Sequence, residues 1–155
     1  MANFTITGQV ETPISLTFAE LSEMPAEVQI ADVQSLGAKR SGCAVKLSAI
    51  LDRCRPLPEA DHLGLHATAD DFHASLPLDA VRDRAVLIYG QDGQPLPLAA
   101  GGPFRLFIPD HSQCKASEID ECANVKFIDR IELTIGKGHD NRPRDEDEHR
   151  AIHEH

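Results

Sequence analysis

The sequence is a series of short apolar runs separated by turns that contain Gly, Pro and Asp. The first run, Phe4–Val10, alternates apolar and polar residues with the period of a β-strand. No apolar run is long enough to span a bilayer. Further short runs predict strands at 27–33, 62–67, 72–76, 85–89, 96–98, 104–108 and 126–135.

Helical signals are fewer and short. Thr17 with Glu20 three residues later forms a capping box, which predicts a helix that ends before Pro25. Apolar residues at helical spacing over 45–51 predict a second helix, and 77–81 suggests a single turn. Since strands outnumber helices and few β-α-β units are visible, the sequence predicts a mixed, strand-rich α+β single domain.

Composition restricts the classes of partner. The chain has 155 residues, enough for one core, and a net charge of −10, which argues against a nucleic-acid coat or a protein that binds anionic membranes. An anionic ligand must therefore find a local basic pocket. The N-terminus lacks the basic and apolar regions of a secretion signal, so we expect a cytoplasmic protein. The four cysteines match no zinc or redox spacing and are interpreted as free thiols.

Residues 137–155 differ in composition from the rest of the chain. They are almost entirely polar and contain four of the eight histidines. Such a stretch buries too little apolar surface to offset its ordering entropy, which predicts a domain at 1–136 and an acidic, His-rich flexible tail at 137–155. His149 and His153, four residues apart, leave open an alternative in which the tail binds a transition metal.

A Gly/Ser loop at 35–42 carries the adjacent cations Lys39 and Arg40. It lies between a predicted strand and a predicted helix, an arrangement that often presents N–H groups to an anion. An ordinary solvated loop is the alternative interpretation, and the sequence leaves both open.

Several short sequence motifs occur in a fixed order between about residues 6 and 135. Together they resemble the molybdopterin-binding domain of the sulfite oxidase family. These motifs are Leu16-Thr17-Phe18, Val45-Lys46-Leu47, Asp70-Asp71-Phe72-His73, Asp92-Gly93-Gln94-Pro95, Gly101-Gly102-Pro103-Phe104-Arg105 and Asn124-Val125-Lys126-Phe127.

The resemblance implies a domain that holds molybdenum on a pyranopterin and performs two-electron oxo-transfer. In that family a cysteine thiolate binds the metal, while cations, His and backbone groups hold the pterin and its phosphate. An Arg fork can bind a phosphate or pterin edge bidentately, and Gly lets the backbone approach a ligand. The residues expected to bind the cofactor are Lys39, Arg40, His73, Gly101, Gly102, Arg105 and Lys126. A strand-face ion pair is the alternative for Arg105, and a solvated side chain is the alternative for Lys126.

Two departures from the family pattern leave a second function open. The position of the ligand cysteine falls near Asp32 or Val33, so Cys43 is the candidate for the catalytic metal ligand. Relatives commonly carry a polar pair where this chain has Ala99-Ala100. The alternative is therefore a non-catalytic descendant of the fold that binds a partner, a small anion or an unmetallated pterin. The sequence does not determine the substrate, whether the cofactor is bound, whether the chain forms a homo-oligomer, or whether it has a redox protein partner.

Overall fold

A computed structural model describes residues 3–109 and 125–141. The strands are β1 (Asn3–Gly8), β2 (Ile14–Thr17), β3 (Gln29–Ile30), β4 (Cys43–Lys46), β5 (His62–Ala67), β6 (Phe72–Pro77), β7 (Val86–Gln91), β8 (Gln94–Pro95), β9 (Arg105–Phe107) and β10 (Arg130–Thr134). The helices are α1 (Phe18–Ser22), α2 (Leu47–Cys54) and α3 (Leu78–Val81), with 3-10 turns η1 (Ala26–Val28), η2 (Val33–Leu36), η3 (Thr68–Asp70) and η4 (Leu98–Ala100). The mixed, strand-rich α+β class predicted from the sequence is confirmed. No helix in the described ranges is long and apolar enough to cross a membrane.

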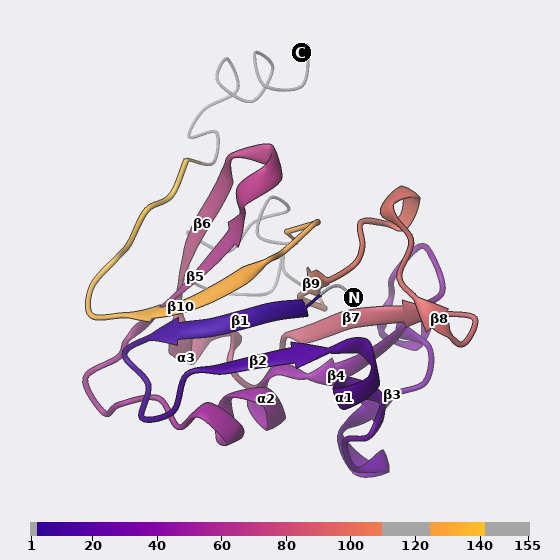
Figure 1. The fold of residues 1–155 in the computed structure, drawn as a ribbon, viewed down its shortest axis with the longest axis horizontal. Coiled ribbons are helices and arrows are strands. Elements are labelled where there is room, and N and C mark those ends of the chain that lie inside the picture. The colour runs from indigo at the N-terminus through magenta and orange to yellow at the C-terminus, as the bar shows by residue number, and fades with distance from the viewer. Residues whose placement is uncertain (1–2, 110–124, 142–155) are drawn as a thin grey trace.

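The strands form two sheets (Figure 1). The first sheet has the order β2-β1-β10-β5-β6, and β1 and β10 pair in parallel although they come from opposite ends of the described chain. The second sheet has the order β3-β4-β7-β8, with β9 paired to β7. Strands far apart in the sequence are therefore neighbours in both sheets.

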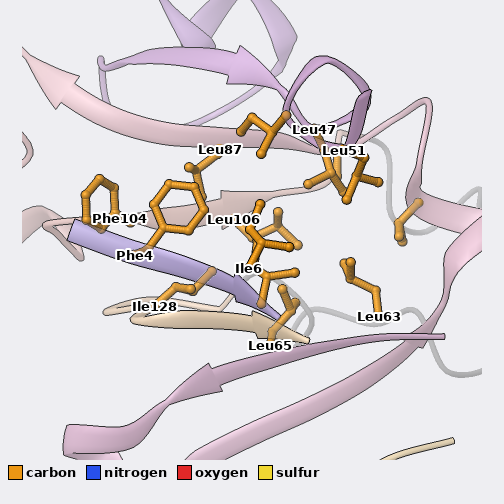
Figure 2. Close-up of a cluster of buried hydrophobic side chains, with 14 of the residues drawn as sticks. Phe4, Ile6, Leu47, Leu51, Leu63, Leu65, Leu87, Phe104, Leu106 and Ile128 are labelled. Carbon is orange, nitrogen blue, oxygen red and sulfur yellow. The ribbon is translucent and has the colours of Figure 1, made fainter. Parts of the chain in front are cut away.

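The large core draws on both sheets and on α2. Figure 2 shows Phe4 and Ile6 of β1 turned toward Leu87 of β7 and Leu106 of β9. The rings of Phe4 and Phe104 are tilted, with centroids 4.9 Å apart, a favourable aromatic arrangement. A smaller cluster packs separately and consists of Val33, Ala44, Val86, Ile88, Leu96 and Ala100. The second sheet thus has apolar side chains on both of its faces.

Two local predictions from the sequence are confirmed. Thr17 caps α1, because its Oγ1 accepts from the backbone N–H of Glu20 at 3.3 Å. Asp92 and Gly93 both have positive φ, at 54° and 78°, and join β7 to β8. This is the backbone geometry that a tight two-residue hairpin requires.

Other boundaries differ from the prediction. The stretch predicted as a helix from 45 begins as β4, which gives way to α2 at Leu47. Ala44 and Val45 are both buried, each in a different cluster, so the strand shows no polar alternation that would reveal it.

The remaining differences are shorter strands. The run predicted over 27–33 contains only the two residues of β3, between η1 and η2, and Ile14–Thr17 is a strand that the pattern did not predict. In the run predicted over 96–98, residues 96 and 97 have no regular secondary structure and lead into η4. The last strand covers Arg130–Thr134 only. The lengths of these strands follow from their pairing with partners that are distant in the sequence, such as β1 and β5 on either side of β10.

Truncation of the core should cost much more stability than truncation of the surface. Leu87 is fully buried, whereas Leu98 is 71% exposed. We expect Leu87→Ala to lower the free energy of unfolding by about 2–5 kcal/mol, because a cavity forms beside the sheet. The matched variant Leu98→Ala should change it by less than about 0.5 kcal/mol. Urea unfolding curves of both variants provide the measurement, and equal midpoints would contradict this assignment of the core.

Candidate functional site

The site is built around the turn that follows η4. Gly101 adopts φ +97°, a left-handed conformation that Gly enters without strain. A Cβ at this position would lie 3.0 Å from Cδ of Arg105 and 3.2 Å from Cγ of Lys126. The Gly101 backbone therefore lies between two cationic side chains. The next residue, Gly102, has no room for any side chain, since a Cβ there would overlap the carbonyl of Leu96.

Backbone hydrogen bonds bring Lys126 to this turn. The N–H of Phe127 donates to the carbonyl of Gly101 at 2.9 Å, and the N–H of Ile128 donates to the carbonyl of Phe104 at 2.9 Å. On the other side, the N–H of Thr5 donates to the carbonyl of Asp129 at 3.1 Å. The short segment 125–129 thus joins the turn to the first sheet. These backbone hydrogen bonds fix the position of the Lys126 backbone.

Arg105 presents an unpaired buried group. Its Nη1 donates to the carbonyl of Ala100 at 3.3 Å, but its Nε is buried and has no hydrogen-bond partner in the described part of the chain. Buried donors are nearly always paired in folded proteins, and leaving one unpaired costs about 1–3 kcal/mol. An acceptor such as a phosphate oxygen would satisfy this donor.

Arg40 adds a third cation. Its Nη1 donates to the carbonyl of Ala99 at 2.8 Å, so Arg40 and Arg105 are held by consecutive carbonyls. Burial, and secondly the nearby charge of Arg40, lower the pKa of Arg105. We call Arg40, Arg105 and Lys126 the cation cluster; within residues 3–109 and 125–141 none of the three forms an ion pair.

The backbone carbonyls of Ala99 and Ala100 provide hydrogen-bond acceptors where this chain has no polar side chains. The alanines that interrupt the family pattern contribute C=O acceptors that orient both guanidinium groups. Every residue type has a backbone carbonyl, so nothing in the sequence could have indicated this role. Lys39 lies next to the cluster in sequence; it is exposed, and its carbonyl accepts from Nε2 of Gln34 at 3.3 Å.

Cys43 packs into the large core. Its sulfur lies against Gly90, since a Cβ built there would come within 2.8 Å of Sγ. Burial, and then the adjacent Cys43, raise the pKa of Tyr89 to about 12, and the Tyr89 hydroxyl donates to Oε1 of Gln29 at 2.7 Å. Ala100, at the cation cluster, belongs instead to the smaller apolar cluster. The thiol thus lies beside Tyr89 and Gly90, against the large core.

Cys54 and Asp32 have structural roles. Cys54 is a free, fully buried thiol, and burial raises its pKa to about 11, so it stays protonated. Asp32, near the expected position of the ligand cysteine, precedes η2 and accepts from the backbone N–H of Gln34 at 3.0 Å. Its carboxylate is an N-cap.

His73 belongs to a different group of residues. It lies in β6 of the first sheet, and its side chain contacts His66, Asp71 and His139. Of the residues predicted to bind a cofactor, the structure therefore brings together Arg40, Gly101, Gly102, Arg105 and Lys126. His149 and His153, proposed above as a metal clamp, lie outside the described residues.

The comparisons with known proteins agree with this architecture. The family model for the oxidoreductase molybdopterin binding domain matches residues 2–137. The chain belongs to this family. A search among curated proteins gave no match.

A solved structure resembles the fold of this molybdopterin-binding domain. It is the sulfane dehydrogenase SoxCD from Paracoccus pantotrophus, with a TM-score of 0.64 and 20% sequence identity. The match covers 88% of this chain and 39% of the SoxCD chain, so this chain spans well under half the length of that relative. At this level of identity the similarity establishes the fold.

Substitution of Gly101 should separate backbone strain from the loss of the site. Gly101→Ala and Gly93→Ala both place a side chain at positive φ, which costs about 1–2 kcal/mol each. A Cβ at 93 meets nothing within 4 Å, whereas a Cβ at 101 pushes on Arg105 and Lys126. We expect similar losses in urea unfolding, but weaker binding of inorganic phosphate only in Gly101→Ala. Equal phosphate affinity in the two variants would contradict the placement of the site.

Proposed function

We propose that the cation cluster binds the anionic end of a pterin cofactor. The observation that carries the proposal is the buried, unpaired Nε of Arg105 beside Gly101. In a chain of net charge −10, three cations gather around residues 99–101 and have no ion-pair partner in the described ranges, so they form a local basic cluster. A phosphate group would neutralise the repulsion between Arg40 and Arg105.

Each residue of the cluster has a distinct part in this binding. Arg105 offers a planar fork suited to two oxygens, while Lys126 is a compact charge without directional preference. Because Gly101 has no Cβ, the side-chain stems of Arg105 and Lys126 pack directly against its backbone, which brings the two cations to the same turn. Arg40 is exposed but tethered to the carbonyl of Ala99, so less side-chain entropy is lost when it meets the anion. Lys39 is exposed and precedes Arg40, so it adds positive charge to the same loop.

The family suggests the chemistry of the cofactor. When bound, a molybdenum pterin of sulfite oxidase type supplies two-electron oxo-transfer, and the protein supplies binding and orientation. We propose this oxidoreductase activity, with molybdopterin as the cofactor, as the first candidate function. A redox protein partner or a second copy of the chain would then complete the electron path. A cytoplasmic location is part of the same proposal.

A second candidate function is supported by the residues around the metal position. The carboxylate of Asp32 is used as a helix cap, and the Cys43 thiol is packed beside Tyr89. Thiolate is the soft ligand that suits molybdenum, and neither residue offers one next to the cation cluster. A non-catalytic descendant that binds the pterin or a small anion without metal fits these residues.

Loss of Arg105 should abolish most anion binding. A charge-assisted contact contributes about 1.5–3 kcal/mol, so Arg105→Ala should weaken binding of inorganic phosphate at least about tenfold. Arg105→Lys should recover part of the affinity, because it keeps the charge and loses the fork. Arg53→Ala, an exposed arginine on α2, is the matched control and should bind like wild type. Calorimetric titration that gives one affinity for all four proteins would remove Arg105 from the site.

Metal content distinguishes the two candidates. The protein is purified from a host that makes molybdopterin, and molybdenum and pterin are measured per chain. Because Asp32 supplies no thiolate, the non-catalytic candidate predicts pterin with little or no molybdenum, whereas the oxidoreductase candidate predicts molybdenum bound with the pterin. One molybdenum per chain would contradict the non-catalytic candidate, and Cys43→Ser would then test whether that thiol holds the metal. Absence of both pterin and phosphate binding would contradict the proposal as a whole.

A further inference from the structure

Two histidines face each other on the outer side of the first sheet. His66 of β5 and His73 of β6 are cross-strand partners, and their neighbours Leu65 and Ala74 face the core. Because side chains alternate along a strand, the two imidazoles project from the opposite face. Nδ1 of His66 and Nδ1 of His73 are 2.7 Å apart. The function proposed above uses neither side chain.

The carboxylates on either side determine where the ring protons are. Nε2 of His66 lies 3.0 Å from Oε1 of Glu132, and Nε2 of His73 lies 3.1 Å from Oδ1 of Asp71. An ionised carboxylate only accepts, so each Nε2 carries a hydrogen. A neutral imidazole has one N–H, so if both rings are neutral, both Nδ1 atoms are unprotonated. Two bare lone pairs at 2.7 Å repel each other, whereas one added proton turns the contact into an N–H···N hydrogen bond.

A metal ion explains this geometry less well. Two nitrogens on one tetrahedral zinc, each about 2.0–2.1 Å from the metal, are about 3.3 Å apart, which exceeds the observed separation. In the described ranges no group of three or more His, Cys, Asp or Glu residues is arranged to hold a metal ion. The 2.7 Å contact therefore fits a shared proton.

The histidine pair is in contact with the chain that follows β10. The ring of His139 lies against the ring of His73, with centroids 4.5 Å apart and planes tilted by 47°. The N–H of His73 donates to Oδ1 of Asn141 at 2.8 Å, and the N–H of Asn141 donates to the carbonyl of His73 at 2.9 Å. The N–H of Ser75 donates to Oδ2 of Asp140 at 2.9 Å. Residues 138–141 thus occupy the edge of β6, the terminal strand of the first sheet.

We propose that His66 and His73 bind one proton between their Nδ1 atoms, and that a second proton releases residues 138–141 from the edge of β6. With a second proton, two N–H groups would face each other, and His139 would bring a third imidazolium to the same place. The His73 ring must then turn away, and its contact with the His139 ring is lost. Mild acid would uncover an edge strand that neutral pH keeps covered.

Burial, more than the surrounding charges, opposes protonation of His66. Burial is the largest cause that lowers the pKa of His66, and the positive charges of Arg130 and His73 act in the same direction, while Glu132 opposes them. The unfolded chain therefore binds more protons than the folded chain once the pH falls below about 6.5, so stability is lost toward acid. The charged or titratable groups that face the pair are Arg130, Glu132, Asp71, His139 and Asp140.

Hydrogen exchange of two amides measures the docking directly. In the full chain we expect the amide protection factors of His73 and Ser75 to fall at least tenfold between pH 7.5 and pH 5. Imidazole nitrogen NMR at pH 7.5 should show both Nε2 atoms protonated and one proton shared by the Nδ1 pair. His62→Gln, which removes a histidine paired with Asp61 on the same strand, should leave this behaviour unchanged.

Two charge variants should shift the pH midpoint of release in opposite directions only if protonation of the histidine pair controls the docking of residues 138–141. Glu132→Gln removes a charge that favours protonation of His66, so the midpoint of release should move to lower pH. Arg130→Gln removes an opposing charge and should move the midpoint to higher pH. Protection that is independent of pH in wild type, equal midpoints in both variants, or protection lost on adding a chelator at pH 7.5 would each overturn the proposal.

Discussion

The parallel pairing of β1 with β10 is the constraint on which the rest of the structure depends. It joins the beginning of the described chain to its end, with Ile6 opposite Ile131 in the register, and both side chains are fully buried. Loop closure of this length is costly in entropy and is offset only by the burial of the large core. Once β10 is in place, the preceding segment must pass the Gly101 turn, where Phe127 hydrogen-bonds to it. The pairing therefore sets both the core and the position of Lys126.

The same strand also positions the second group of titratable residues. On β10, alternate side chains point to opposite faces, so Ile131 and Leu133 enter the core while Glu132 reaches His66 on the outer side. The cation cluster lies at the second sheet, and the histidine pair lies on the first. The two groups of residues therefore lie apart, so mutations can test the two proposals separately.

The candidate site was predictable in part, and the reasons differ among its residues. Arg105 and Gly101 stand in a motif whose order and spacing carry information, so the sequence pointed to them. The carbonyls of Ala99 and Ala100 did not stand out, because backbone acceptors belong to every residue. His73 was predicted to bind the cofactor, and the structure places it apart from the cation cluster. Its partners come from β5, from the turn before β6 and from the chain after β10, and these contacts depend on strand pairing that the sequence does not display.

Sequence by itself determined the strand-rich class, the Thr17 cap and the Asp92-Gly93 turn, because each rests on residues close together in the chain. It also indicated a local basic site in an acidic protein. Only the tertiary structure decided which cations meet at Gly101, that the Cys43 thiol packs beside Tyr89, and that two histidine nitrogens lie 2.7 Å apart. Those juxtapositions depend on the register of strands distant in sequence, and register is fixed by burial of the whole core and by no local pattern.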